Sequence, residues 1–310
     1  MFDTVCCRLS DLPDTKRPHG YADCEYLRDH PYFRHNDTLY CLDYEFAGAK
    51  LESGVLWRVA RKMEKNERLG YFGFWGEVFE EHIAWLFEIY ADTNQNTFHR
   101  APKYENTKDE LPICDAIVMS GTTAVLIEVK LGTCAADVRY SGNYVKFRQF
   151  LEEKLVSGTD RPIGVSQLVK AIQNITTLPP ENLPDWLRGV KKFIPLIITK
   201  DDIGSSWMTT TYLNARFKQS LGTEKIDKGL VTPLLTMSVA TLERAIYTLK
   251  KTALSEILEE RVKEDPVLGR PFEAASTYIH RGMPRGVFKH IEIMQDLTNE
   301  LEKDFQMKDG

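Results

Sequence analysis

Residues 113–130 read ICDAIVMSGTTAVLIEVK. Two runs rich in β-branched residues flank the tetrapeptide SGTT, which predicts a β-hairpin with a four-residue loop. If Met119 pairs with Ala124, the antiparallel register places Asp115 directly opposite Glu128. Side chains that face each other in this way lie about 4.5–5.5 Å apart at Cβ, and like charges there are destabilising.

The residues between the turn and the two acids are apolar on both faces of the predicted hairpin. Ile117 faces Leu126 on the carboxylate side, and Val118 faces Val125 on the other side. Strands that are apolar on both faces are typical of the buried centre of a sheet. We therefore expect this strand pair to lie inside the protein.

Lys130 completes the set of charged residues at this end of the hairpin. It lies two residues beyond Glu128, so both side chains project from the same face. Two facing acids require a cation, or one of them must stay protonated. The pattern predicts a site of two carboxylates and one ammonium. The alternative is that Asp115 and Glu128 mark strand ends in solvent, with Lys130 as their ion pair.

Composition places the chain among globular proteins. Of its 310 residues, 43% are hydrophobic and 27% are charged, which is ordinary for such proteins. No run approaches the roughly 18 apolar residues of a membrane span, so we expect a soluble, cytoplasmic protein without a membrane partner. The net charge of −5 argues against a positive potential over the whole molecule that would attract nucleic acid. It is compatible with a local basic groove that binds nucleic acid.

The six cysteines form no C-x-x-C pair and no zinc-type spacing. Disulfides are not expected, and Cys114, inside the predicted strand, should behave as a small apolar residue. A metal site built from Cys24 and Cys41 with His30 or His35 is a weaker alternative.

The remaining elements follow from hydrophobic periodicity. We expect helices over 51–65, 75–90, 144–155, from 165 to the Pro-Pro pair at 179–180, and from Ser238 to about Val262. Strands are expected near Phe98 and over 39–42, 193–199 and 230–237, with Pro195 indicating a sheet edge or a bulge. This order predicts an α/β fold with a mixed central sheet and helices on both faces. The expected divisions are a mixed N-terminal region (1–66), a core (67–240) and a helical C-terminal region (241–310).

Glu80 is the acid of the 75–90 helix that leans toward the sheet. At about 100° per residue, it lies about 70° from the centre of the apolar stripe. Glu77, Glu81 and Glu88 fall on the solvent side.

Four short motifs occur in a characteristic order. They are Gly76-x-x-Phe79-Glu80, Asp115, Glu128-Val129-Lys130 and Gly164-x-x-Gln167. In this order and context they resemble the PD-(D/E)XK nuclease superfamily, over about residues 65–200. Cys114 stands where the family name has proline.

The resemblance implies a restriction-endonuclease-like fold and hydrolysis of phosphodiester bonds with Mg²⁺, for which Mn²⁺ should substitute. Asp115, Glu128 and the backbone carbonyl of Val129 would hold the metal, and Glu80 would bind a second metal directly or through water. Lys130 would orient or deprotonate the attacking water, or neutralise developing charge.

The resemblance also gives Gln167 a role as an orienting group, although helical periodicity alone would place it in solvent. Further basic residues that could contact phosphate are Lys146, Arg148, Lys170 and Lys200.

The first functional hypothesis is a Mg²⁺-dependent deoxyribonuclease, acting in antiviral defence against foreign DNA, in mobile-element processing or in repair. The alternative is a catalytically inactive nuclease-like fold that serves as a nucleic-acid-binding or assembly module, with a protein partner or a second copy of itself. Acyl and glycosyl hydrolases lack support, because the chain has no G-x-S-x-G, Walker A or H-E-x-x-H motif.

Overall fold

The computed structural model describes residues 6–7, 30–36, 38–44, 47–48, 50, 54–91, 95–106, 112–134, 136–139, 143–158, 162–203, 207–222 and 229–264. The chain divides into two compact units. One comprises Met1–Glu77 and Thr133–Glu152, and the other comprises Val78–Gly132 and Glu153–Gly310. None of the described helices is both long and apolar enough to cross a lipid bilayer.

The second unit contains a mixed five-stranded sheet with the order β4-β5-β6-β7-β8. The strands are β4 (Thr97–Arg100), β5 (Ala116–Ser120), β6 (Thr123–Lys130), β7 (Lys192–Thr199) and β8 (Leu235–Ser238). The first three form an antiparallel meander, and β6, β7 and β8 are parallel. The expected α/β class with a mixed sheet is therefore confirmed.

The hairpin register agrees with the sequence prediction, but the expected four-residue loop is wrong. Ser120 pairs with Thr123, so only Gly121 and Thr122 form the loop. Met119 pairs with Ala124 and Ala116 pairs with Ile127. Asp115 directly precedes β5, and the same register carries it to the level of Glu128. Because β6 is flanked by β5 and β7, it is a central strand, as its two apolar faces predicted.

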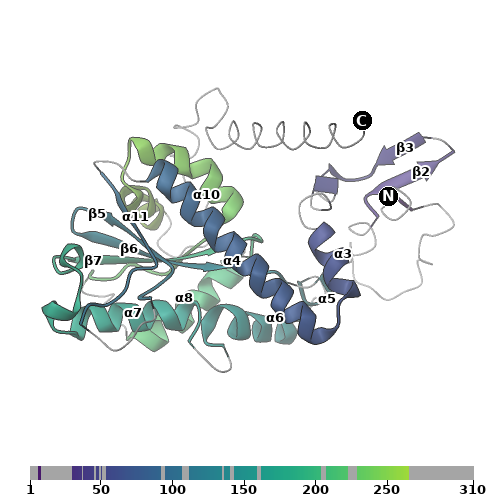
Figure 1. Cartoon of the computed structure of the whole chain (residues 1–310). Helices are drawn as coiled ribbons and strands as arrows, with labels where there is room; N and C mark the ends of the chain where they lie inside the picture. Colours follow the sequence, from purple (N-terminus) through teal and green to yellow (C-terminus); the bar gives the residue numbers. More distant parts are fainter. Residues whose placement is uncertain are drawn as a thin grey trace, which may run out of the picture. The chain divides into compact units, whose positions relative to one another are not determined.

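Helices cover both faces of this sheet (Figure 1). On one side lie α7 (Val165–Thr177) and α8 (Trp207–Leu221). On the other side lie α10 (Val239–Ile246), α11 (Leu254–Glu264) and the C-terminal part of α4 (Lys65–Tyr90). The mixed sheet flanked by helices follows the general architecture of α/β proteins.

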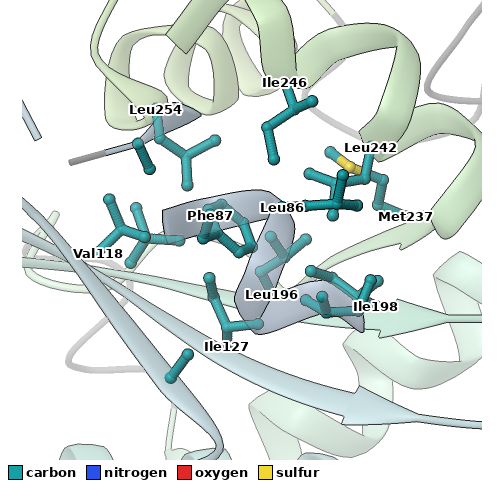
Figure 2. Packing of buried hydrophobic residues seen from close by; sticks show 14 of the residues in the cluster. Leu86, Phe87, Val118, Ile127, Leu196, Ile198, Met237, Leu242, Ile246 and Leu254 are labelled. Atoms are coloured by element: carbon teal, nitrogen blue, oxygen red, sulfur yellow. The ribbon is translucent and has the colours of Figure 1, made fainter. Parts of the chain in front are cut away.

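The main core lies between the sheet and the α4, α10 and α11 side (Figure 2). Leu86, Phe87 and Tyr90 of α4 are fully buried there. They pack with alternate residues of the strands, such as Val118 and Ile127. The stripe that predicted the 75–90 helix is therefore the stripe that faces this core.

Pro195 marks an irregularity in β7, but β7 is not an edge strand. On the β6 side its pairing is regular and includes Leu126 with Pro195. On the other side the register shifts by one residue between the pairs Phe193–Val231 and Leu196–Leu235. Phe193 N–H points to that side and donates to Leu230 O at 2.8 Å. Backbone groups two residues apart in a strand point to the same side, so Pro195, like Phe193, faces β8. Proline has no N–H to donate, and it lies where the pairing between β7 and β8 is interrupted.

Asn214 of α8 stabilises the segment that leads into β8. Its Nδ2 donates to Leu234 O at 2.8 Å, and its Oδ1 accepts from Leu234 N–H at 2.8 Å. Leu234 is fully buried. The side-chain amide therefore takes the place of a strand partner for this residue.

The first unit holds a small three-stranded sheet and several helices. The sheet contains β1 (Cys6–Cys7), β2 (Tyr32–His35) and β3 (Thr38–Cys41) in that order. Its helices are α3 (Gly54–Lys62), the first part of α4, α5 (Ala136–Arg139) and α6 (Tyr144–Leu151). Directly after α6, a π-helix (Glu152–Val156) leads into the second unit. The expected short strand at 39–42 and the helix from 144 are confirmed.

The structure differs from the expected elements in several places. The strand expected over 230–237 covers only Leu235–Ser238. The helix expected over 75–90 begins ten residues earlier, because the glycines at 70, 73 and 76 do not interrupt it. The helix α8 was not expected at all. The long helix expected from Ser238 is broken: Ser238 does cap α10, but a 3₁₀ turn (Tyr247–Lys250) separates it from α11.

Two expectations fall on residues that are not described. The helical C-terminal region expected over 241–310 lies outside the described residues from 265 onward, and so does Cys24 of the alternative metal site. The divisions at 66 and 240 stay a prediction, and α10 and α11 contribute to the same hydrophobic cluster as the sheet.

Candidate active site at the end of the central hairpin

The hairpin brings Asp115 and Glu128 together at the end of β5 and β6. The backbone N–H of Val129 donates to Asp115 Oδ2 at 2.7 Å. This hydrogen bond fixes the Asp115 carboxylate beside β6, immediately before the first residue of β5.

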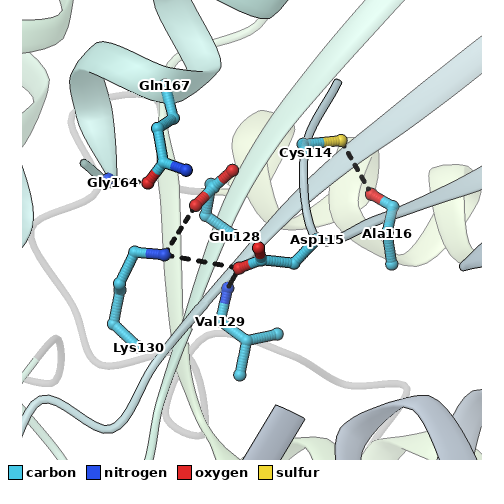
Figure 3. Close-up of polar contacts among 8 residues, drawn as sticks. All are labelled: Cys114, Asp115, Ala116, Glu128, Val129, Lys130, Gly164 and Gln167. Carbon is cyan, nitrogen blue, oxygen red and sulfur yellow. Dashed lines mark hydrogen bonds and ion pairs between the residues drawn. The ribbon is translucent and has the colours of Figure 1, made fainter. Parts of the chain in front are cut away.

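Lys130 joins the two carboxylates (Figure 3). Its Nζ lies 2.7 Å from Glu128 Oε2 and 3.3 Å from Asp115 Oδ2. The Glu128 side chain is fully buried, whereas about a fifth of the Lys130 and Asp115 side chains is exposed. The two acids therefore do not end in bulk solvent, and the convergence of all three charged groups is as the sequence predicted.

Burial dominates the electrostatics of Glu128. Loss of hydration raises its pKa from 4.5 to about 8. The positive charge of Lys130 lowers the pKa, and the negative charge of Asp115 raises it further. At neutral pH, in the absence of any additional cation, Glu128 is therefore inclined to hold a proton.

Lys130 remains charged. Burial lowers its pKa, but the attraction of Glu128, then of Asp115, and a smaller attraction of Glu80 outweigh burial and raise the pKa above its ordinary value. Held between two acids in this way, Lys130 supplies a fixed positive charge, and its raised pKa makes it a poor general base.

Glu80 lies on α4 beside the buried Phe79, and its own side chain is exposed. Its charge acts on the Lys130 ammonium, so the structure places it within electrostatic reach of the site. Glu81, one residue on, forms an ion pair with Arg100 instead. The place of Glu80 in the site stays a prediction, because its side chain is exposed.

Gln167 lies near the N-terminus of α7, and its amide end points in the direction of Glu128 (Figure 3). The backbone N–H of Gly164 donates to Gln167 Oε1 at 2.9 Å. The Gln167 side chain is half-buried, so the solvent position expected from periodicity alone was wrong. Because its oxygen accepts this bond, the NH₂ group is the end that remains for other contacts.

Gly164 itself was not singled out by the sequence as a positioning residue. It has φ 47° and ψ −110°, and an added Cβ would lie 2.2 Å from Leu155 O. A glycine followed three residues later by glutamine, just before an apolar run, is a helix-start signal. That signal could have identified the Gly164–Gln167 contact.

The site fits a divalent cation with oxygen ligands. Glu128 Oε1 is buried and has no hydrogen-bond partner among the described residues. This oxygen is therefore available to a cation, whose binding would displace the proton that the raised pKa favours. Val129 N–H points toward Asp115, and the carbonyl of the same extended residue points the same way. Two carboxylates and one carbonyl suffice for Mg²⁺, which keeps several of its waters. No cluster of three or more His, Cys, Asp and Glu side chains suited to a metal occurs among the described residues.

Cys114 supports this site without taking part in its chemistry. It is buried, and its Sγ donates to Ala116 O at 3.2 Å. Burial, followed by the charges of Glu128 and Asp115, raises the pKa of the thiol well above its ordinary value. An uncharged thiol in such surroundings behaves as a small apolar residue, as the sequence suggested.

The other basic residues considered from the sequence lie on several different elements. Lys146 and Arg148 lie on α6, in the first unit. Lys170 is exposed on α7. Lys200 follows β7, and its Nζ lies 3.8 Å from Asp201 Oδ1.

Comparisons of this chain with protein-family models, with curated proteins and with solved structures gave no match.

Proposed function

We propose that the chain is a divalent-metal-dependent nuclease with a restriction-endonuclease-like fold, and that its substrate is DNA. The observation that carries this proposal is the buried Glu128 carboxylate, which lies beside Asp115 and Lys130 and whose Oε1 has no hydrogen-bond partner among the residues that the structure describes. The order of α4, the antiparallel meander, α7 and the parallel β7 supports the same assignment. It matches the resemblance on which the motifs were first grouped.

The metal would be held by Asp115, Glu128 and the carbonyl of Val129. When bound, Mg²⁺ supplies a Lewis acid that lowers the pKa of a coordinated water and polarises the phosphoryl oxygen. Glu80 would contribute through water, because its side chain is exposed and its charge reaches the site.

Lys130 acts by position and charge. Its ammonium, held by Asp115 and Glu128, would orient the attacking water and offset the negative charge that develops on the phosphoryl group. Its raised pKa favours these roles over proton abstraction. Gln167 would use its NH₂ group to orient the Glu128 carboxylate or the same water.

The test is a cleavage assay with Mg²⁺ on linear, circular and single-stranded DNA. Lys130→Ala should lower the cleavage rate by about 100-fold or more, since a positioned charged group contributes on the order of 10²–10⁴. Lys218→Ala, which changes an exposed lysine of α8, should cleave like wild type. Absence of cleavage on every substrate, or equal rates in both variants, contradicts the proposal.

A second function has one specific observation in its favour. The Lys130 ammonium already pairs with both carboxylates, as it would in a purely structural ion pair. In that case the fold serves as a binding or assembly module. Calorimetric titration with Mn²⁺ separates the two functions: uptake that is lost in Asp115→Asn supports the nuclease, and no uptake by wild type supports the module.

A further inference from the structure

The hairpin of α3 and the first turns of α4 presents an unusual concentration of large apolar side chains. Residues 69–75 of α4 read LGYFGFW and contain no charge. Seven residues make about two helical turns, so these side chains surround the helix axis. A helix that is apolar all round requires contacts on every side.

Within the described residues these side chains are only partly covered. Leu69 is 67% exposed and Phe74 is 56% exposed. The rings of Trp57 and Phe72 join α3 to α4 at 5.3 Å between centroids. The ring of Trp75 packs against Phe74 at 5.6 Å. We call the residues Trp57, Leu69, Tyr71, Phe72, Phe74 and Trp75 the α3–α4 aromatic surface.

Three glycines of α4 accompany this surface at helical spacing: Gly70, Gly73 and Gly76. Each costs about 1 kcal/mol relative to alanine inside a helix. A Cβ added at any of them would meet no heavy atom within 4 Å, so packing within the chain does not require glycine there. Glycines would, however, let the backbone of a bound partner approach the helix closely.

Basic side chains flank the aromatic surface. Residues 54–68 contain five basic and two acidic residues, although the whole chain carries a net charge of −5. The five are Arg58, Arg61, Lys62, Lys65 and Arg68, and all are exposed. An apolar protein partner does not require this positive charge, whereas a polyanion does.

We propose that the α3–α4 aromatic surface binds single-stranded nucleic acid, through base stacking on its rings and phosphate contacts with the flanking cations. Exposed rings beside a basic stretch are the features that bind single strands without sequence preference. A duplex hides its base faces and cannot use the rings in this way. This inference rests on the proposed function, because that function already makes nucleic acid the substrate.

The test measures binding separately from cleavage. The full chain with Asp115→Asn is titrated without divalent metal against a fluorescein-labelled oligothymidylate and against a labelled DNA hairpin, with anisotropy as readout. Phe74→Ala should weaken oligothymidylate binding roughly 5- to 100-fold, the effect of losing one stacked base. Lys62→Glu with Lys65→Glu should weaken it further and reduce its salt dependence.

The control variants change similar residues elsewhere. Trp207→Ala removes an exposed ring of α8 (59% exposed), and Lys218→Glu reverses an exposed charge of the same helix. Both should bind like the parent protein. Equal binding in all variants, or a preference for the hairpin, overturns the inference. Loss of self-association in Phe74→Ala with unchanged DNA binding also overturns it, in favour of a contact between copies of the chain.

The two proposals can fail independently. Oligothymidylate binding that depends on Phe74, without any cleavage by wild type, leaves this inference standing and removes the nuclease. Cleavage by wild type, without any effect of Phe74→Ala on binding, does the reverse.

Discussion

A single buried carboxylate, Glu128, lies at the centre of the proposed site. Its side chain is fully buried and one oxygen faces Lys130. The other oxygen has no hydrogen-bond partner in the described part of the chain. Burying a carboxylate is costly unless it is paired, protonated or bound to a metal. The residue therefore destabilises the metal-free protein when it ionises.

The pH dependence of stability tests this directly. Between pH 4.5 and about 8, the folded chain holds a proton on Glu128 that the unfolded chain has released. The free energy of unfolding should therefore fall as pH rises through this window, by up to about 1.4 kcal/mol per pH unit from this residue. In Glu128→Gln this contribution is absent, so the variant gains stability relative to wild type as pH rises.

Urea denaturation in EDTA at several pH values between 4 and 9 measures the difference. Glu256→Gln, which changes an exposed acid of α11, should keep the wild-type pH dependence. Parallel curves for wild type and Glu128→Gln would show that the Glu128 pKa is not raised.

The sequence was sufficient to predict the meeting of Asp115, Glu128 and Lys130, because a short hairpin fixes its own register. It was not sufficient for Gln167. Periodicity reports the orientation of a side chain relative to its own helix, whereas the hydrogen bond from Gly164 and the position of α7 over the sheet decide where Gln167 lies.

At the scale of elements, the start of α7 depends on close approach between backbones. Gly164 has a positive φ and lies against the carbonyl of Leu155. Only a residue without Cβ fits there, so the chain before α7 is held at a fixed distance from the preceding π-helical turn.

Gly164→Ala should lower the free energy of unfolding by about 3 kcal/mol or more, because backbone strain and a steric clash act together. Chemical denaturation measures the loss. Gly189→Ala is the matched control, since its Cβ would meet nothing within 4 Å. A loss below about 1 kcal/mol at Gly164 would contradict the close approach.

The entry into β8 depends on the side chain of Asn214. Replacing it with alanine leaves the buried N–H and C=O of Leu234 without their partner, which should cost about 2–4 kcal/mol. Ser220→Ala, at an exposed position of the same helix, should have little effect. Equal thermal midpoints for the two variants would show that water replaces the amide.

The break between α10 and α11 could not be read from local pattern. The apolar periodicity continues through 247–253, and a continuous helix was the natural prediction. Asn96 instead donates to Leu249 O at 3.3 Å and accepts from Leu254 N–H at 2.9 Å. A buried residue more than 150 positions away thus satisfies backbone groups that a continuous helix would have paired internally.

At the scale of the whole second unit, Asn96 connects segments that are distant in sequence. Besides Leu249 and Leu254, its Oδ1 accepts from Ser120 Oγ at 2.9 Å. It is almost completely buried. One side chain therefore holds the turn end of β5 against the junction of the two C-terminal helices.

Asn96→Ala should lower the free energy of unfolding by about 3–5 kcal/mol, since it leaves several buried polar groups unpaired. Backbone amides both near Ser120 and at the start of α11 should exchange hydrogen faster than in wild type. Asn66→Ala, at an exposed position of α4, is the control. Faster exchange confined to α11 would show that the connection to the hairpin carries no stability.

The wide separation of β6 and β7 in sequence has a consequence during synthesis. Residue 130 ends β6, and β7 begins only at residue 192. At about 5–20 residues per second, the ribosome needs several seconds to deliver that neighbour. Meanwhile the nascent strand TAVLIEVK offers a largely apolar edge to other chains. Glu128 and Lys130 are its only charges. We therefore expect the two charged side chains of the proposed site to oppose aggregation as well, before the strand is paired.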